Sequence, residues 1–221
     1  MIRTLLVILF IALPFKAVAL IEVDITRGNL NPLPIAVSPL SIDENSKKNF
    51  QNILKIKNIG SEISAIVENN LRTSGLFNPL DKDAFLQAPD IANLKPRFED
   101  WSLIKAQALI TGNVKFVDDK LRVEFRLFDV LAGKEMMALA FTTVPNNWRR
   151  IGHMITDKIY ERLTGEKGYF DTRIIYVAEE GPKTSRKKRL ALMDQDGANN
   201  IFLTYGNELV LTPRFHPESQ M

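Results

Sequence analysis

Two stretches of the chain repeat apolar residues at intervals of three and four, the spacing of an amphipathic helix. The first covers residues 59–74, where Asn58 or Ser61 can cap the start and Gly75 can close the end in the left-handed conformation. The second covers residues 147–163 and repeats isoleucine every four positions. A shorter helix is expected at residues 98–106.

Other stretches alternate apolar and polar residues, as strands do when one face of their sheet is buried. The alternation is clear at residues 114–116 and 121–127, and further strands, made of apolar residues, are expected at residues 35–37 and 136–141. The charged alternate positions would face solvent, and the helices are the obvious cover for the apolar face. The pattern predicts an α+β domain at residues 20–165, with helices packed on a mixed sheet.

After Gly168 the chain changes to short apolar strands separated by polar turns, which is typical of an all-β meander. Strands are expected at residues 173–177, 190–193 and 201–203, with a polar loop at 181–189. We therefore divide this part of the chain into a linker, residues 166–171, and an all-β segment, residues 172–221.

Residues 1–19 have the parts of a secretory signal peptide. Arg3 gives the positive start, an apolar run covers residues 5–14, and small residues precede a cleavage site expected between Ala19 and Leu20. An exported chain without cysteine fits the bacterial periplasm. We expect the mature chain to reside there without inserting into the membrane.

The segment that would begin the mature chain is the best candidate for a binding site. It alternates apolar and polar residues, so it is either an edge strand of its own domain or a releasable strand that pairs with a partner's sheet edge. Its residues are Leu20, Ile21, Glu22, Val23, Asp24, Ile25, Thr26 and Arg27.

Charge and composition narrow the classes of function. The 221 residues include 29 Lys+Arg and 26 Asp+Glu, without the long basic stripe that nucleic-acid binding requires. The absence of cysteine excludes disulfides, thiolate metal sites and cysteine nucleophiles. His153 and His216 are too far apart for metal-ligand spacing. No nucleotide-binding glycine loop or nucleophile elbow occurs, so we expect no enzyme activity, cofactor or small-molecule substrate.

Three local features have plain structural interpretations. The basic run at residues 186–189 could touch polyanions but is expected to be a solvated loop. The turn from Asp194 to Gly197 resembles the start of a calcium loop, yet position 203, where that loop needs glutamate, is Leu203. His153 is expected to be a packed or surface side chain, and the two tryptophans are expected to anchor the core or the domain junction.

Several stretches together resemble the TolB family. Residues 71–77 read Leu-Arg-Thr-Ser-Gly-Leu-Phe and match a family pattern that usually begins with aspartate, for which this chain has Asn70. The similarity extends over the whole mature chain. The other matching segments are residues 106–112, 127–130, 148–150, 159–165, 170–177, 189–199 and 209–215.

The resemblance implies a non-enzymatic binding protein, with an N-terminal α/β domain followed by a six-bladed β-propeller. It implies that the strand at residues 20–27 docks on TolA, that the propeller holds the lipoprotein Pal, and that the system supports outer-membrane integrity and constriction at cell division. A blade needs about 40–45 residues, so the chain is expected to hold about one blade of a truncated propeller. Most of the Pal-binding surface is expected in the missing blades.

Two alternatives stay open. Residues 20–165 could act as a free-standing periplasmic interaction module. The chain could also be the remnant of a hydrolase in which a propeller precedes a catalytic domain. Further blades downstream would support the TolB-like protein, whereas a Ser–Asp–His domain would support the hydrolase.

Overall fold

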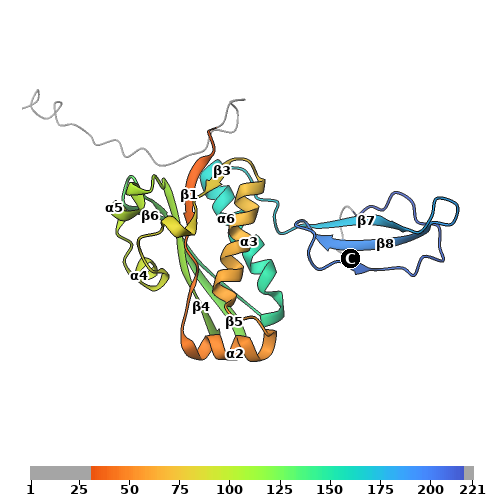
Figure 1. Cartoon of the computed structure of the whole chain (residues 1–221), viewed down its shortest axis with the longest axis horizontal. Helices are drawn as coiled ribbons and strands as arrows, with labels where there is room; N and C mark the ends of the chain where they lie inside the picture. Colours follow the sequence, from red (N-terminus) through yellow and green to blue (C-terminus); the bar gives the residue numbers. More distant parts are fainter. Residues whose placement is uncertain (1–30, 217–221) are drawn as a thin grey trace, which may run out of the picture.

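The computed structural model describes residues 31–216, which form two separate sheets (Figure 1). The larger sheet has the order β3-β1-β4-β5-β6, with β2 paired to β4, and the smaller has the order β7-β8-β9. The strands are β1 (Leu33–Val37), β2 (Ser41–Ile42), β3 (Phe77–Pro79), β4 (Ala108–Val117), β5 (Lys120–Asp129), β6 (Lys134–Thr143), β7 (Arg173–Glu180), β8 (Lys187–Asp194) and β9 (Ile201–Phe202). The helices are α2 (Glu44–Leu54), α3 (Ile59–Thr73), η1 (Lys82–Ala84), α4 (Pro89–Leu94), α5 (Phe98–Leu103), η2 (Pro145–Asn147) and α6 (Trp148–Thr164).

The larger sheet is mixed, as the sequence predicts. Strand β1 runs parallel to both β3 and β4, while β4, β5 and β6 form an antiparallel meander. Asp118 and Asp119 connect β4 to β5 and have φ values of 50° and 58°. Two consecutive residues at positive φ are characteristic of a tight hairpin turn.

Helices α3 and α6 cover one face of this sheet, and the main core lies between them and the strands (Figure 1). The helices approach closely at Gly152, where an added Cβ would lie 2.8 Å from a methyl group of Ile66. The chief buried residues of this core are Ile35, Phe50, Ile59, Ile63, Leu71, Ile110, Val114, Leu121, Val123, Phe125, Leu127, Ile151, Ile155, Ile159 and Leu163.

Both ends of α3 follow the predicted chemistry, and α6 ends in the same way as α3. Asn58 accepts a hydrogen bond from the backbone N–H of Ser61 at the start of α3. Gly75 lies just beyond the end of this helix with φ +75°, and Gly165 ends α6 with φ +77°. Such caps satisfy backbone groups that have no partner within the helix.

Helices α4 and α5 lie on the other side of the sheet (Figure 1) and cover a smaller core. Trp101 is 1% exposed in this core, and its indole N–H donates to the Gln87 side-chain oxygen over 2.8 Å. Trp101 is therefore a core anchor, one of the two roles expected for it. Trp148, at the start of α6, is half-buried against the main core.

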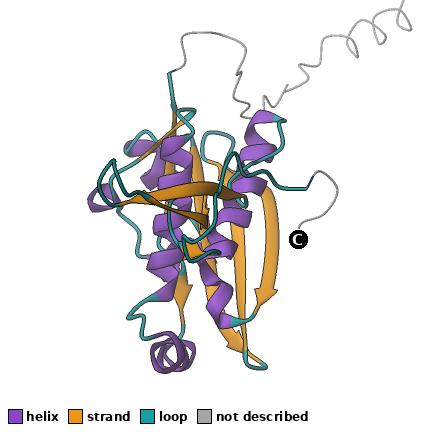
Figure 2. Cartoon of the chain, turned by 90° about the vertical axis from the view of Figure 1, so that its right-hand side faces the viewer, coloured by secondary structure: helices purple, strands orange, loops and turns teal. Residues whose placement is uncertain are grey.

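The small sheet extends away from the first domain (Figure 1), and Figure 2 shows it in front of the domain. Ala191 is the one fully buried apolar residue of β7, β8 and β9. An antiparallel sheet with so little burial has no core of its own. The fold is therefore a mixed α/β domain followed by propeller-like strands, which confirms the predicted fold class.

Several predicted bounds are wrong in ways that have physical reasons. Strand β4 begins at Ala108 rather than at residue 114, because its first residues are buried on both faces and so do not alternate. Helix α5 ends at Leu103 rather than at residue 106, because Lys105 takes φ +64°, which is not a helical value. The loop expected up to residue 189 stops earlier, because β8 already begins at Lys187 and pairs with β7.

Helix α2 was not predicted. It begins with a strong cap, in which Asp43 accepts from both the backbone N–H and the hydroxyl of Ser46. Only Ser46 and Phe50 of this helix are buried, which is too little to give an apolar stripe.

The predicted signal peptide, the Ala19–Leu20 cleavage site and the strand at residues 20–27 all lie outside the described residues. In the part of the chain that the structure describes, no helix combines the length and apolar character needed to cross a membrane.

Candidate functional site

The candidate site is the junction at which α6 meets the linker and the small sheet. Its anchor is Asp157 of α6, which accepts hydrogen bonds from the backbone N–H groups of Phe170 (2.7 Å) and Asp171 (3.1 Å). Burial raises the pKa of Asp157, while these two hydrogen bonds oppose that rise. Gly168 makes the close approach possible, because a Cβ there would lie 2.4 Å from the Cα of Asp157.

Aromatic packing holds the same linker. Phe170 is fully buried, and its ring lies edge-on to Tyr160 of α6 with the centroids 5.8 Å apart. Tyr169 also contacts Tyr160 edge-on, at 5.7 Å. The linker is thus attached to α6 by both hydrogen bonds and rings, which fixes where the small sheet begins.

Ion pairs extend this attachment. Arg150 of α6 donates to both carboxylate oxygens of Asp171, over 3.0 and 3.1 Å. Arg149, one residue earlier, forms an ion pair with Asp196 in the turn after β8. The forked hydrogen bonds of Arg150 to Asp171 are directional, so they orient the linker on α6 as well as attract it.

A buried polar network crosses the junction beneath these ion pairs. Both hydrogens of the Asn70 amide are used, since its nitrogen donates to His153 Nδ1 (2.9 Å) and to the Thr156 hydroxyl oxygen (3.2 Å). The Asn70 oxygen accepts from the side-chain nitrogen of Gln195 over 2.8 Å. Asn70 and Gln195 are 125 positions apart in the sequence, so α3 is linked directly to the small sheet.

This network assigns the protons of the histidine ring. The Thr156 hydroxyl donates to the backbone oxygen of Gly152 (2.8 Å), so it can only accept from Asn70. The atom that Asn70 presents to His153 is therefore its nitrogen, and Nδ1 of the ring must accept. In the neutral ring the proton then sits on Nε2, which has no hydrogen-bond partner and lies 3.7 Å from the nearer oxygen of Asp196.

His153, Asp194 and Asp196 offer the one group of potential metal ligands found among residues 31–216, with ligand atoms within 4.8 Å of one another. The chemistry of the group does not fit a metal ion. The neutral ring carries its proton on Nε2, the nitrogen that faces Asp196, and a metal ligand needs a free lone pair there. Arg149 already pairs with Asp196 and adds a positive charge. The group suits domain docking better than metal binding.

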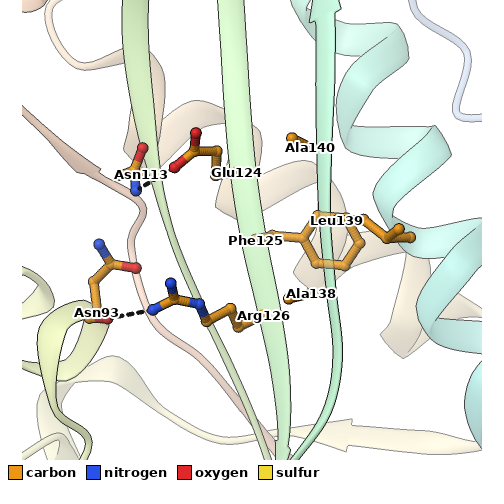
Figure 3. A pocket seen from close by; sticks show the side chains of 8 residues that line it. All are labelled: Asn93, Asn113, Glu124, Phe125, Arg126, Ala138, Leu139 and Ala140. Carbon is orange, nitrogen blue, oxygen red and sulfur yellow. Dashed lines mark hydrogen bonds between the residues drawn. The ribbon is translucent and has the colours of Figure 1, made fainter.

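A second feature is a shallow pocket of about 230 Å³ on the face of the sheet away from α6 (Figure 3). Asn113 donates to Glu124 over 3.2 Å, and Arg126 donates to the backbone oxygen of Asn93 over 3.3 Å. The pKa of Glu124 is lowered, chiefly by its hydrogen bond from Arg122. The polar groups in this pocket are largely paired with each other, so the pocket offers little reactive chemistry.

Residues 187–189 of the basic run belong to β8, whereas the sequence predicts a loop there. Lys188 lies opposite Glu179 in the β7–β8 ladder, and its ammonium group lies 2.9 Å from that carboxylate. Arg186 also pairs with Glu179, and Arg189 pairs with Glu180 over 2.7 Å. Three of the four cations thus pair with two carboxylates, Glu179 and Glu180, which offsets about half of the positive charge of this run.

The structure also places the other residues that the sequence analysis singled out. Gly197 has φ +84°, as the turn interpretation of residues 194–197 requires. His153 is 2% exposed and is therefore packed, one of the two roles expected for it. His216 is exposed near the end of the described chain.

The sequence did not predict that Asn70, His153 and Gln195 meet. The one available signal was the asparagine at a position where the resemblance expects aspartate.

These features define a class of protein: a closed α/β domain attached through a polar junction to a sheet of the kind that propellers repeat. The chain belongs to the TolB family. The model of the TolB amino-terminal domain matches residues 21–136, more than half of the chain, and the model of the TolB beta propeller domain matches residues 160–221.

Two individual proteins are close in sequence or structure. The Tol-Pal system protein TolB of Pelagibacter ubique (strain HTCC1062) is 80% identical over 216 residues, which are 98% of this chain and 48% of that protein. The crystal structure of TolB from Acinetobacter baumannii matches with a TM-score of 0.66 and 25% identity, over 82% of this chain and 41% of that one. The chain thus spans about half the length of the curated relative it matches.

Proposed function

We propose that this chain is a binding component of the Tol–Pal system in the periplasm. It would connect the inner-membrane Tol complex to Pal at the outer membrane, and so support outer-membrane integrity and constriction at cell division. The proposal assigns it no catalytic activity and no cofactor. Its strongest support is the 80% identity to a Tol-Pal system protein over nearly the whole chain.

The junction supports a connecting role. A connector must keep its two binding parts in a fixed relation, and here hydrogen bonds, ring contacts and ion pairs hold the small sheet to α6. In this proposal residues 1–19 are a signal peptide removed between Ala19 and Leu20. Residues 20–165 then form the first domain, 166–171 the linker and 172–221 the start of the propeller. Amino-terminal sequencing of the exported protein should begin at Leu20.

The TolA contact is assigned to the strand that would start the mature chain: Leu20, Ile21, Glu22, Val23, Asp24, Ile25, Thr26 and Arg27. Its alternation of apolar and polar residues suits pairing with a partner's sheet edge, where backbone hydrogen bonds provide affinity. Pal binding is proposed for the whole protein, with most of its contacts in propeller blades beyond residues 172–221.

Isothermal titration of the mature chain with TolA tests the proposal. Val23→Pro removes a backbone donor and fixes φ, so it should weaken binding by about tenfold or more. Val23→Ala keeps the backbone donor and serves as the matched control, with an affinity near that of the unaltered chain. Equal affinities for the two variants would contradict strand pairing, and no binding by the unaltered chain would contradict the TolA assignment.

A further inference from the structure

His153 is a titratable side chain buried where the two parts of the molecule meet. It is 2% exposed, and its Nε2 is buried without a hydrogen-bond partner. Its other nitrogen accepts from Asn70, which in turn accepts from Gln195 of the small sheet. The proton on this ring is therefore coupled by two hydrogen bonds to the contact between α3 and the small sheet.

A second proton on the ring would disturb this arrangement. Protonated Nδ1 is a donor, and it would face the N–H of the Asn70 amide, which is also a donor. Turning the Asn70 amide would present its oxygen to the ring, but its nitrogen would then face the donating nitrogen of Gln195. The Thr156 hydroxyl would also have to give up its bond to Gly152. A proton at His153 thus places donor against donor, or forces several side chains to rearrange.

The charges around the ring act in both directions. Asp194 and Asp196, in the turn after β8, favour the protonated ring, and so does Asp171 of the linker. Arg149 of α6 disfavours it, and its own ion pair with Asp196 offsets part of that carboxylate's attraction. Burial is the largest influence, and the net effect lowers the pKa of His153 below its ordinary value of 6.5. Asp157, also on α6, interacts with the same ring.

We propose that Asn70, His153 and Gln195 form an acid-sensitive clasp, which docks the small sheet on α3 and α6 while His153 is neutral and loosens when His153 gains a proton. The junction hydrogen bonds carry this inference, since they accept only the neutral ring. The clasp regulates how firmly the two parts of the chain are held, whatever partners they bind.

The direction of the pH effect follows from linkage. A histidine with a lowered pKa in the docked state binds fewer protons there than when released, where its pKa returns towards 6.5. Docking is therefore fully favoured above about pH 6.5 and weakens as the pH falls below that value. The weakening stops once the pH is below the pKa of the docked state.

Spin-label distance measurement tests the clasp in the full chain. The chain has no cysteine, so cysteines placed at Asn52 of α2 and Thr184 of the β7–β8 loop, both exposed, can be labelled specifically. We expect one narrow distance distribution at about pH 7.5 and a broader one at about pH 5.5, since these values bracket the ordinary histidine pKa. An unchanged or narrower distribution at the lower pH would overturn the proposal.

Two variants separate His153 from other acid effects. His153→Asn keeps an acceptor for Asn70 but cannot take a proton, so its narrow distribution should persist at the lower pH. Asn70→Asp has nearly the same shape and offers only acceptors, so it should favour the protonated ring, raise the pKa of His153 and also remove the acid response. NMR titration of the ring measures that pKa directly.

The matched control is His216→Asn, which removes the other histidine of the chain. Its distance distribution should broaden on acidification just as that of the unaltered chain does. Circular dichroism at both pH values checks that the domains stay folded. A broadening that persists in folded His153→Asn and Asn70→Asp would contradict the clasp.

Discussion

The two sheets of this molecule differ in how far their apolar side chains are buried. In the larger sheet the apolar residues of β4 and β5 lie under α3 and α6, and Phe125 is 1% exposed. In the smaller sheet Phe202 is 49% exposed and Ala191 is the only fully buried apolar residue of its strands. The comparison shows that regular strand pairing does not make a core, because burial needs a second layer.

The sharpest way to test this difference is to remove the same side chain from each sheet. Phe125→Ala should lower the free energy of unfolding by about 3–5 kcal/mol, because it leaves a cavity in the closed core. Phe202→Ala, the matched control, should cost about 1 kcal/mol or less, because half of its ring is already in solvent. Both tryptophans lie in the first domain, so their fluorescence during urea unfolding reports this transition. Equal losses would contradict the comparison.

A smaller effect is expected where the two regions join. Asp157→Ala leaves the backbone N–H groups of Phe170 and Asp171 without their acceptor, at a cost of about 1–3 kcal/mol. Hydrogen exchange of these two amides should accelerate accordingly, while amides of β5 keep their protection. Asp157→Asn retains one acceptor oxygen, so its exchange rates at these amides should lie between those of the unaltered chain and those of Asp157→Ala. Unchanged exchange at Phe170 would show that the linker is held by its rings alone.

The smallest effect is expected on the surface of the small sheet. Lys188→Ala removes one of two cations that pair with Glu179, and exposed ion pairs of this kind contribute little to stability. We expect no measurable change in the urea midpoint. The pKa of Glu179 is lowered mainly by its hydrogen bond from Lys188, so it should rise in this variant. A clear loss of stability would mean that the cross-strand charges do more than keep the sheet edge polar.

Burial also determined which helices and strands could be predicted from the sequence. The helices α3 and α6 were predicted closely, since each buries a continuous stripe, Asn58 suits the start of α3, and Gly165 suits the end of α6. The alternation of β5 was equally clear because one face is covered and the other is charged. Helix α2 and the short parallel strands β2 and β3 gave no such pattern, since their positions depend on tertiary contacts rather than on periodicity.

The junction was harder to predict than the fold. His153 could be expected only to be packed or on the surface, because its partners lie on α3 and in the turn after β8. Gln195 reaches Asn70 across 125 positions, and no local spacing encodes such a contact. The assignment of the ring proton needed the direction of each hydrogen bond, down to the Thr156 hydroxyl. The strand at residues 20–27 stays a prediction.

Hydrogen exchange over the whole chain tests the central claim most directly, namely that a closed domain carries a sheet without a core of its own. We predict strong protection for the amides of Val123, Phe125 and Leu127 in β5, measurable protection for Phe170 and Asp171, and rapid exchange for Ile201 and Phe202 in β9. Protection in β9 equal to that in β5 would contradict the account, because it would require a core that the described residues of the small sheet do not contain.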